Sequence, residues 1–144
     1  MTTRILTEIN SVNWAGYPHP CGQDQGKIPA LLTQLLDDQE STAYTAACEL
    51  WNITAHQGNV GPSAVPLLPL LMDIVPTLSE RIQVELFDTL YQFAVAAHVQ
   101  EPAGWQAELR REFLSFKPQF TAFTESTSEE IRHFAGEIIL LLDQ

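Results

Sequence analysis

The feature that most constrains the fold is an apolar, proline-containing segment that occurs twice along the chain. Residues 28–32 read Ile-Pro-Ala-Leu-Leu, and residues 65–69 read Val-Pro-Leu-Leu-Pro, so the second copy starts 37 positions after the first (65 − 28). Apolar residues around each copy recur every three or four positions, as they do in an amphipathic helix. Repeats of this length are typical of stacked helical hairpins, each of which buries its apolar face against the next. The spacing therefore predicts an all-α fold.

The chain length is that of one domain, because 144 residues can bury a sizeable core without disulfides or metals. We expect a single helical repeat domain over residues 1–144. An N-terminal helix and loop are expected in residues 1–26, and helical hairpins in residues 27–60, 61–100 and 103–144. The helices of the first hairpin are expected at about 28–37 and from the acidic turn at 37–41 to about residue 56.

Several residues predict where helices begin and end. Gly58 suits a left-handed cap at the end of the second hairpin helix. The sequence Thr-Leu-Ser-Glu at 77–80 matches a capping box, and Thr-Ser-Glu-Glu at 127–130 matches a second N-terminal cap. Pro118 interrupts an aromatic and apolar stripe that runs from Trp105 to Phe123, which indicates two abutting helices.

The loop at residues 12–26 contains Trp14 and Tyr17, which we expect to pin it onto the first hairpin. Cys48 lies among alanines and is interpreted as a small core residue, whereas Cys21 lies in the polar loop. Residues 1–10 do not match a secretory signal, so both cysteines are expected to be reduced in the cytoplasm. No apolar run approaches the ~20 residues that cross a bilayer, so no membrane partner is expected.

Several segments resemble a known family of helical repeats. The segments are Ser128–Ala135, the proline-bearing helix at Pro66 and Pro69, Trp14 with its glycine loop, residues 28–32, His56–Gly58 and residues 65–68. Together they resemble small bacterial HEAT-like proteins over residues 12 to about 100. The resemblance implies a HEAT-like α-α superhelix and a role in protein binding. The second helix carries Thr42 and Ala43 where that family usually has an arginine.

Charge is the most informative bulk property. Eighteen acidic residues against seven basic ones give a net charge of −11, and no Lys or Arg occurs from residue 28 to residue 80. Such a surface repels nucleic acids and anionic lipids and attracts a basic protein. The residues predicted to contact this partner are Asp37, Asp38, Glu40, Asp73 and Glu80, with Trp51 as an aromatic anchor. The alternative for each acid is a solvated helix end, and the alternative for the charge as a whole is that it serves solubility alone.

The sequence contains no motif that specifies an enzyme, a cofactor or a metal site. It has no glycine-rich phosphate loop, nucleophile elbow or His-Glu-x-x-His pattern. His56 and His98 close helices, where helix capping explains them. Glu130 and His133 form one Glu-x-x-His half-motif, whereas a di-iron site requires two. We therefore predict no catalytic, cofactor-binding or metal-binding residues.

The favoured function is a non-enzymatic protein-binding module, most specifically an immunity protein that neutralises a basic toxin such as a nuclease. Its strong negative charge would steer rapid association with such a toxin. A monomer or a weak homo-oligomer is expected. Two alternatives stay open: a structural scaffold or oligomerising adaptor, and an enzyme of HEAT-like build such as a chromophore lyase.

Overall fold

A computed structural model describes residues 2–102 and 104–144, and within these ranges the chain is helical and contains no strand. The α-helices are α1 (Thr2–Asn10), α2 (Ile28–Leu35), α3 (Glu40–Thr54), α4 (Ala64–Ile74), α5 (Glu80–Ala97), α6 (Trp105–Ser115), α7 (Lys117–Phe123) and α8 (Glu129–Leu142). Short 3-10 helices are η1 (Trp14–Gly16), η2 (Gln25–Lys27), η3 (His56–Gly58) and η4 (Val75–Thr77). The all-α prediction is confirmed.

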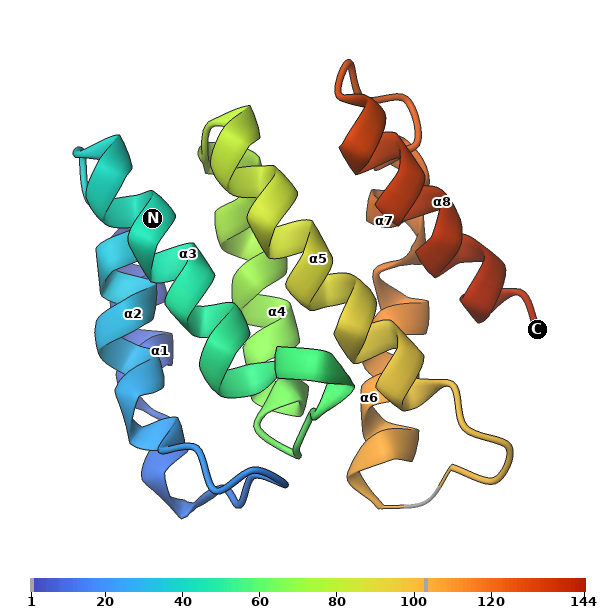
Figure 1. The fold of residues 1–144 in the computed structure, drawn as a ribbon, viewed down its shortest axis with the longest axis horizontal. Helices are drawn as coiled ribbons and strands as arrows, with labels where there is room; N and C mark the ends of the chain where they lie inside the picture. Colours follow the sequence, from blue (N-terminus) through green and yellow to red (C-terminus); the bar gives the residue numbers. More distant parts are fainter. Residues whose placement is uncertain (1, 103) are drawn as a thin grey trace.

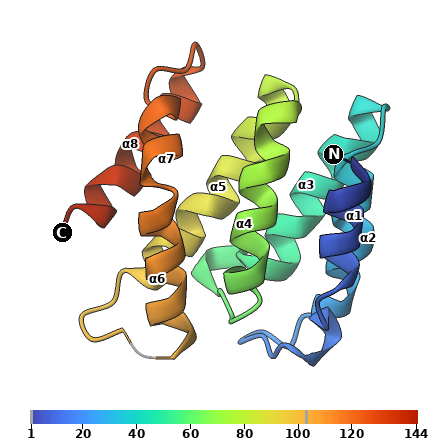
Figure 2. The ribbon, with the colours of Figure 1, turned by 180° about the vertical axis from the view of Figure 1, so that it is seen from behind.

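The helices form two layers. In Figure 1, α3, α5 and α8 lie side by side across the front of the molecule, and their N-terminal ends are all at the top. Figure 2 shows the other side, where α1, α4 and the consecutive helices α6 and α7 lie in front. Within the front layer α5 packs against both α3 and α8. Two helices outside this layer pack against its ends: α2 packs against α3, and α7 packs against α8. The apolar core lies between the layers and is continuous from α1 to α8.

The first two helices after the loop pack closely because their facing residues differ in size. The buried residues of α2 are large and branched (Ile28, Leu31, Leu32 and Leu35), and those of α3 include Ala43, Ala46 and Ala47. Small residues on one helix let the backbone of the other approach. Pro29 lies in the first turn of α2, where its missing N–H costs no hydrogen bond.

Two expected helix ends are corrected by the structure. Helix α2 ends at Leu35 rather than at residue 37, and α3 ends at Thr54 rather than near residue 56. After α3 the chain turns through η3, where Gln57 has a φ of 54° and Gly58 a φ of 78°. The left-handed conformation predicted for Gly58 is therefore confirmed, but it terminates η3 and not the α-helix itself.

The capping interpretation holds for α8 and fails for α5. Ser128 is the N-cap of α8, and its hydroxyl accepts a hydrogen bond from the Ile131 N–H at 3.3 Å. Ser79 occupies the same position before α5 but makes no side-chain cap. Its hydroxyl instead donates to the Glu40 carboxylate at 2.6 Å. This contact joins the N-termini of α5 and α3.

The aromatic stripe is broken at Pro118 as predicted, with α6 ending at Ser115 and α7 beginning at Lys117. The two helices supply rings to one cluster in the core. Phe113 and Phe120 are stacked with their centroids 5.6 Å apart, and Phe87 of α5 meets Phe123 edge-on at 4.9 Å. These rings fix α6 and α7 against α5.

The loop between α1 and α2 is held by buried hydrogen bonds. The Trp14 indole N–H donates to the Ile9 carbonyl at 2.7 Å, and this hydrogen bond anchors the loop to α1, whereas the sequence predicts an anchor on the first hairpin. The Gln25 side chain donates to the Ile53 carbonyl at 2.7 Å and accepts from the Ser63 hydroxyl at 2.5 Å. The loop thereby connects α3 with the start of α4. In the part of the chain that the structure describes, no helix has the length and apolar character needed to cross a membrane.

Candidate functional site

The N-termini of α3, α5 and α8 lie at one end of the front layer, the upper end in Figure 1. Each of these helices begins with acidic residues: Glu40 in α3, Glu80 in α5, and Glu129 with Glu130 in α8. A carboxylate in the first turn is favourable because the helix dipole places partial positive charge there. The parallel arrangement of the three helices gathers these acids on one edge of the molecule.

A pocket of about 500 Å³ opens at this edge between α5, α8 and the side of α3. Its lining residues are Tyr44, Glu80, Arg81, Val84, Glu85, Thr127, Ser128, Glu129 and Glu130. Four of these are acids and one is basic. The carboxylates of Glu80, Glu129 and Glu130 have no hydrogen-bond or ion-pair partner among the described residues.

A polar cluster on α3 and α5 forms one wall of the pocket. The Arg81 guanidinium carbon lies 3.7 Å from the centroid of the Tyr44 ring, in a cation–π arrangement. The Tyr44 hydroxyl donates to Glu85 Oε1 at 3.3 Å, and the Cys48 sulfur lies 3.9 Å from Glu85 Oε2. Arg81 also reaches Glu40, with 4.0 Å between Nη1 and Oε2.

The Glu85 carboxylate disfavours ionisation of its neighbours. Burial, together with the negative charge of Glu85, raises the pKa of the Cys48 thiol. The interaction with Cys48, followed by the charge of Glu85, raises the pKa of the Tyr44 hydroxyl. Both groups are therefore protonated at neutral pH, so the cluster offers hydrogen-bond donors and a carboxylate but no thiolate nucleophile. Cys48 is half-buried beside Glu85, which corrects its interpretation as a core residue.

The structure brings some of the predicted site residues together. Glu40 and Glu80 lie at the pocket edge, and Asp37 and Asp38 precede α3 at the same end of the molecule. Asp37 accepts a hydrogen bond from the Gln39 N–H at 2.7 Å and so shapes the turn that leads into α3. All four side chains are exposed.

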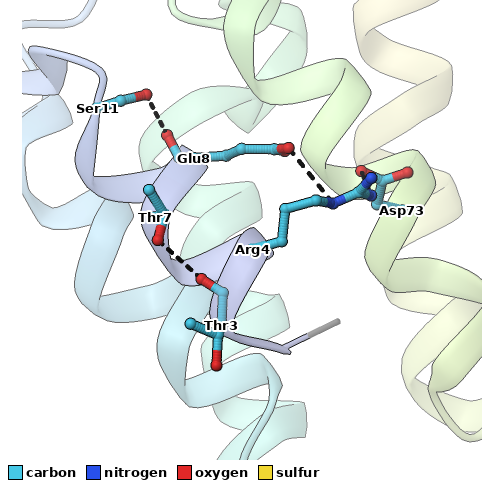
Figure 3. Close-up of polar contacts among 6 residues, drawn as sticks. All are labelled: Thr3, Arg4, Thr7, Glu8, Ser11 and Asp73. Atoms are coloured by element: carbon cyan, nitrogen blue, oxygen red, sulfur yellow. Dashed lines mark hydrogen bonds and ion pairs between the residues drawn. The ribbon is translucent and has the colours of Figure 1, made fainter.

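Asp73 lies apart from these acids, on α4 in the rear layer. Figure 3 shows Arg4 of α1 between Glu8 and Asp73. The distance from Arg4 Nη2 to Asp73 Oδ2 is 3.6 Å, and that from Arg4 Nε to Glu8 Oε1 is also 3.6 Å. Asp73 therefore links α4 to α1, and its charge is partly neutralised there.

Trp51 lies farther along α3 and is half-buried. Its ring meets the His56 ring edge-on, with a centroid distance of 5.0 Å. Its indole N–H is buried and has no hydrogen-bond partner among the described residues. The Trp51 ring thus packs against η3 and does not line the acidic pocket.

Sequence reasoning missed the other residues that line the pocket. Tyr44 and Glu85 are on different helices, 41 positions apart, so their contact follows only from how α3 and α5 pack. Glu129 and Glu130 carried a usable signal, because they follow the Ser128 cap and must lie at a helix N-terminus. The sequence alone favours a capping role for both residues and places Glu130 in a single Glu-x-x-His half-motif, and neither interpretation predicts a pocket.

Two histidines outside the pocket make polar contacts with neighbouring residues. His98 Nδ1 lies 3.3 Å from Arg110 Nη1, and His19 Nε2 lies 2.8 Å from the Asn59 carbonyl oxygen. Within residues 2–102 and 104–144, no three His, Cys, Asp or Glu side chains are grouped so that they could hold a metal ion. The chemistry that the acidic pocket offers is the binding of a cation.

Comparisons with protein-family models, with curated proteins and with solved structures found no match to this chain. The geometry of the pocket is therefore the basis for the function proposed below.

Proposed function

We propose that this chain is a non-enzymatic protein-binding module and that its partner is a basic protein. The observation that carries the proposal is the pocket between α3, α5 and α8, where three carboxylates have no internal partner among the described residues. Carboxylates that attract a positively charged surface accelerate association and select against acidic partners. The net charge of −11 acts in the same direction over longer distances.

We also propose a HEAT-like superhelical build. The two-layer arrangement supports it, because each front-layer helix packs against the next one along the layer and against a helix behind it. Helical repeat proteins of this kind use one layer as an extended binding surface. In that architecture α3, α5 and α8 would form the surface that meets the partner.

The most specific form of the proposal is an immunity protein that neutralises a cationic toxin such as a nuclease. The immunity protein must then bind the toxin faster than the toxin acts on its target. Electrostatic attraction between opposite charges raises the association rate. Both cysteines are free, which fits a reducing compartment such as the cytoplasm.

The test is affinity capture from a lysate of the source organism at low and at moderate salt. The tagged chain is expected to retain a basic protein at low salt and to release it as salt screens the contacts. Expressed alone, that protein should be toxic, and co-expression of this chain should restore growth. Recovery of the bait alone, or of a neutral complex insensitive to salt, would favour a scaffold and contradict the proposal.

A matched pair of variants locates the binding surface. E80Q/E129Q/E130Q removes three charges at the pocket, and E101Q/E108Q/E112Q removes three charges in and before α6, in the rear layer. Both variants change the net charge equally, so any difference between them reports the position of the charges. Only the first variant should lose the captured protein, because only it removes charges at the pocket. Equal loss in both would show that binding depends on overall charge and not on this surface.

A further inference from the structure

The Tyr44 ring already holds a guanidinium group, the one that belongs to Arg81 of the same chain. The guanidinium carbon lies 3.7 Å from the ring centroid, and Glu40 Oε2 lies 4.0 Å from its Nη1. The Tyr44 hydroxyl donates a hydrogen bond to the Glu85 carboxylate, and this hydrogen bond orients the ring. A flat aromatic face with carboxylates around its edge suits a planar guanidinium better than a compact ammonium group.

The contact with Arg81 is easily exchanged. The side chains of Arg81 and Glu40 are 58% and 53% exposed, so their ion pair is screened by water and stabilises the fold little. Arg81 lines the pocket together with Glu80, Glu129 and Glu130, whose carboxylates have no partner among the residues that the structure describes. A guanidinium from outside would meet the ring and several acids together, whereas Arg81 moving away would keep its charge in water.

We infer that Tyr44, Glu85 and the pocket acids form a subsite for an arginine side chain of the partner, and that Arg81 occupies this subsite until the partner arrives. The inference deepens the proposed function and rests on it for the existence of a basic partner. It adds a preference for arginine over lysine at this position. It also makes Arg81 an internal competitor of the partner.

The test uses fluorescein-labelled hexa-arginine and hexa-lysine peptides, with binding followed by fluorescence anisotropy at low salt. R81K keeps the charge of residue 81 but removes the guanidinium that stacks on Tyr44. Hexa-arginine should bind R81K about two- to fivefold more tightly than the wild type, the size of an exposed cation–π contact. Hexa-lysine should bind both proteins equally. Equal affinity of hexa-arginine for the two proteins would overturn the inference.

Substitutions of Tyr44 provide the second measurement. Y44L removes the ring without changing the charge, so the preference for hexa-arginine over hexa-lysine should disappear while hexa-lysine binding is unchanged. Y44F keeps the ring and should retain the preference. Loss of affinity for both peptides in Y44L would overturn the inference, provided that circular dichroism and thermal unfolding match the wild type.

The two proposals fail in different ways. Arginine selectivity that depends on Tyr44 and Arg81, with no basic protein captured from lysate, would support the subsite and contradict the proposed function. Capture of a basic protein that binds wild type and R81K equally, with hexa-arginine also unaffected, would support the proposed function and contradict the subsite.

Discussion

Cys48 and Glu85 illustrate how one contact between neighbouring helices sets the chemistry of a side chain. The Cys48 sulfur lies 3.9 Å from Glu85 Oε2, and burial together with this carboxylate raises the pKa of the thiol. A raised pKa means that less thiolate is present at any pH below it. Since the thiolate is the reactive form, Cys48 should be protected from alkylation.

Replacing Glu85 tests this protection. In a C21S background, where Cys48 is the remaining thiol, E85Q should speed alkylation by iodoacetamide at pH 8, because removing the negative charge lowers the pKa of Cys48. The rate is followed by mass spectrometry, and E108Q on α6 serves as the control. The difference between variants should shrink at pH values above the raised pKa, where the thiol is ionised in all of them. Equal rates at pH 8 would contradict the assignment.

Phe87 is the ring in α5 that contacts both Phe120 and Phe123 of α7, and it is fully buried. F87A should lower the free energy of unfolding by about 3–5 kcal/mol, because it removes buried apolar area and leaves a cavity. Urea denaturation measures the change. V95A on the same helix is the matched control, since Val95 is 41% exposed, and it should change stability by less than about 0.5 kcal/mol. Similar losses for the two variants would exclude this packing account.

At the scale of single residues, the sequence predicted what depends on near neighbours. The left-handed conformation of Gly58 follows from local turn chemistry and was found. The hydrogen bond of Trp14 depends on a tertiary contact and goes to Ile9 of α1, outside the hairpin onto which the sequence predicts that Trp14 packs. Cys48 was misplaced because its environment is supplied by Glu85, 37 positions away. Asp73 was grouped with the other acids because the sequence does not reveal that α4 pairs it with Arg4 of α1.

At the scale of elements, Ser79 and Ser128 form a natural comparison, because each is the N-cap residue of an α-helix. Ser128 accepts a hydrogen bond from the Ile131 N–H, whereas Ser79 donates to Glu40. S128A should lower the free energy of unfolding by about 1 kcal/mol, the usual cost of losing a cap. S79A should cost less, because the contact that it removes is exposed. Thermal or urea unfolding measures the free energy of unfolding of both variants. A loss of stability in S79A that equals or exceeds the loss in S128A would contradict this difference.

The elements themselves were largely predictable. Helical periodicity, Pro118 and the Ser128 cap fixed α6, α7 and α8 to within a few residues. The expected capping box at residues 77–80 failed because α5 begins only at Glu80, whereas Thr77 lies in η4 and its hydroxyl donates to the Ile74 carbonyl at 2.7 Å. The pocket was not predicted as such, because it requires three helices to begin at the same edge.

At the scale of the whole molecule, the excess of negative charge opposes compactness. The chain has eighteen acidic and seven basic residues, so repulsion among the acidic side chains exceeds attraction between opposite charges. Few ion pairs form among the described residues. Raising NaCl from about 10 mM to about 150 mM shortens the Debye length from ~30 Å to ~8 Å and should raise Tm. Scanning calorimetry measures it, and E80Q/E129Q/E130Q should show a weaker salt dependence. A Tm that falls with salt would contradict net self-repulsion.

Helix α5 occupies the middle of the front layer and packs against α3, α4, α6 and α8. Opening of the molecule at one end removes only some of these contacts, so amide hydrogens in α5 should exchange with deuterium more slowly than those in α1 or α8. Faster exchange in α5 than in α8 would exclude this order. The acidic pocket lies across the seam between α5 and α8. A partner bound there would contact both helices and oppose the separation of α8 from α5. Binding should therefore slow hydrogen exchange along α8 beyond the residues that the partner touches.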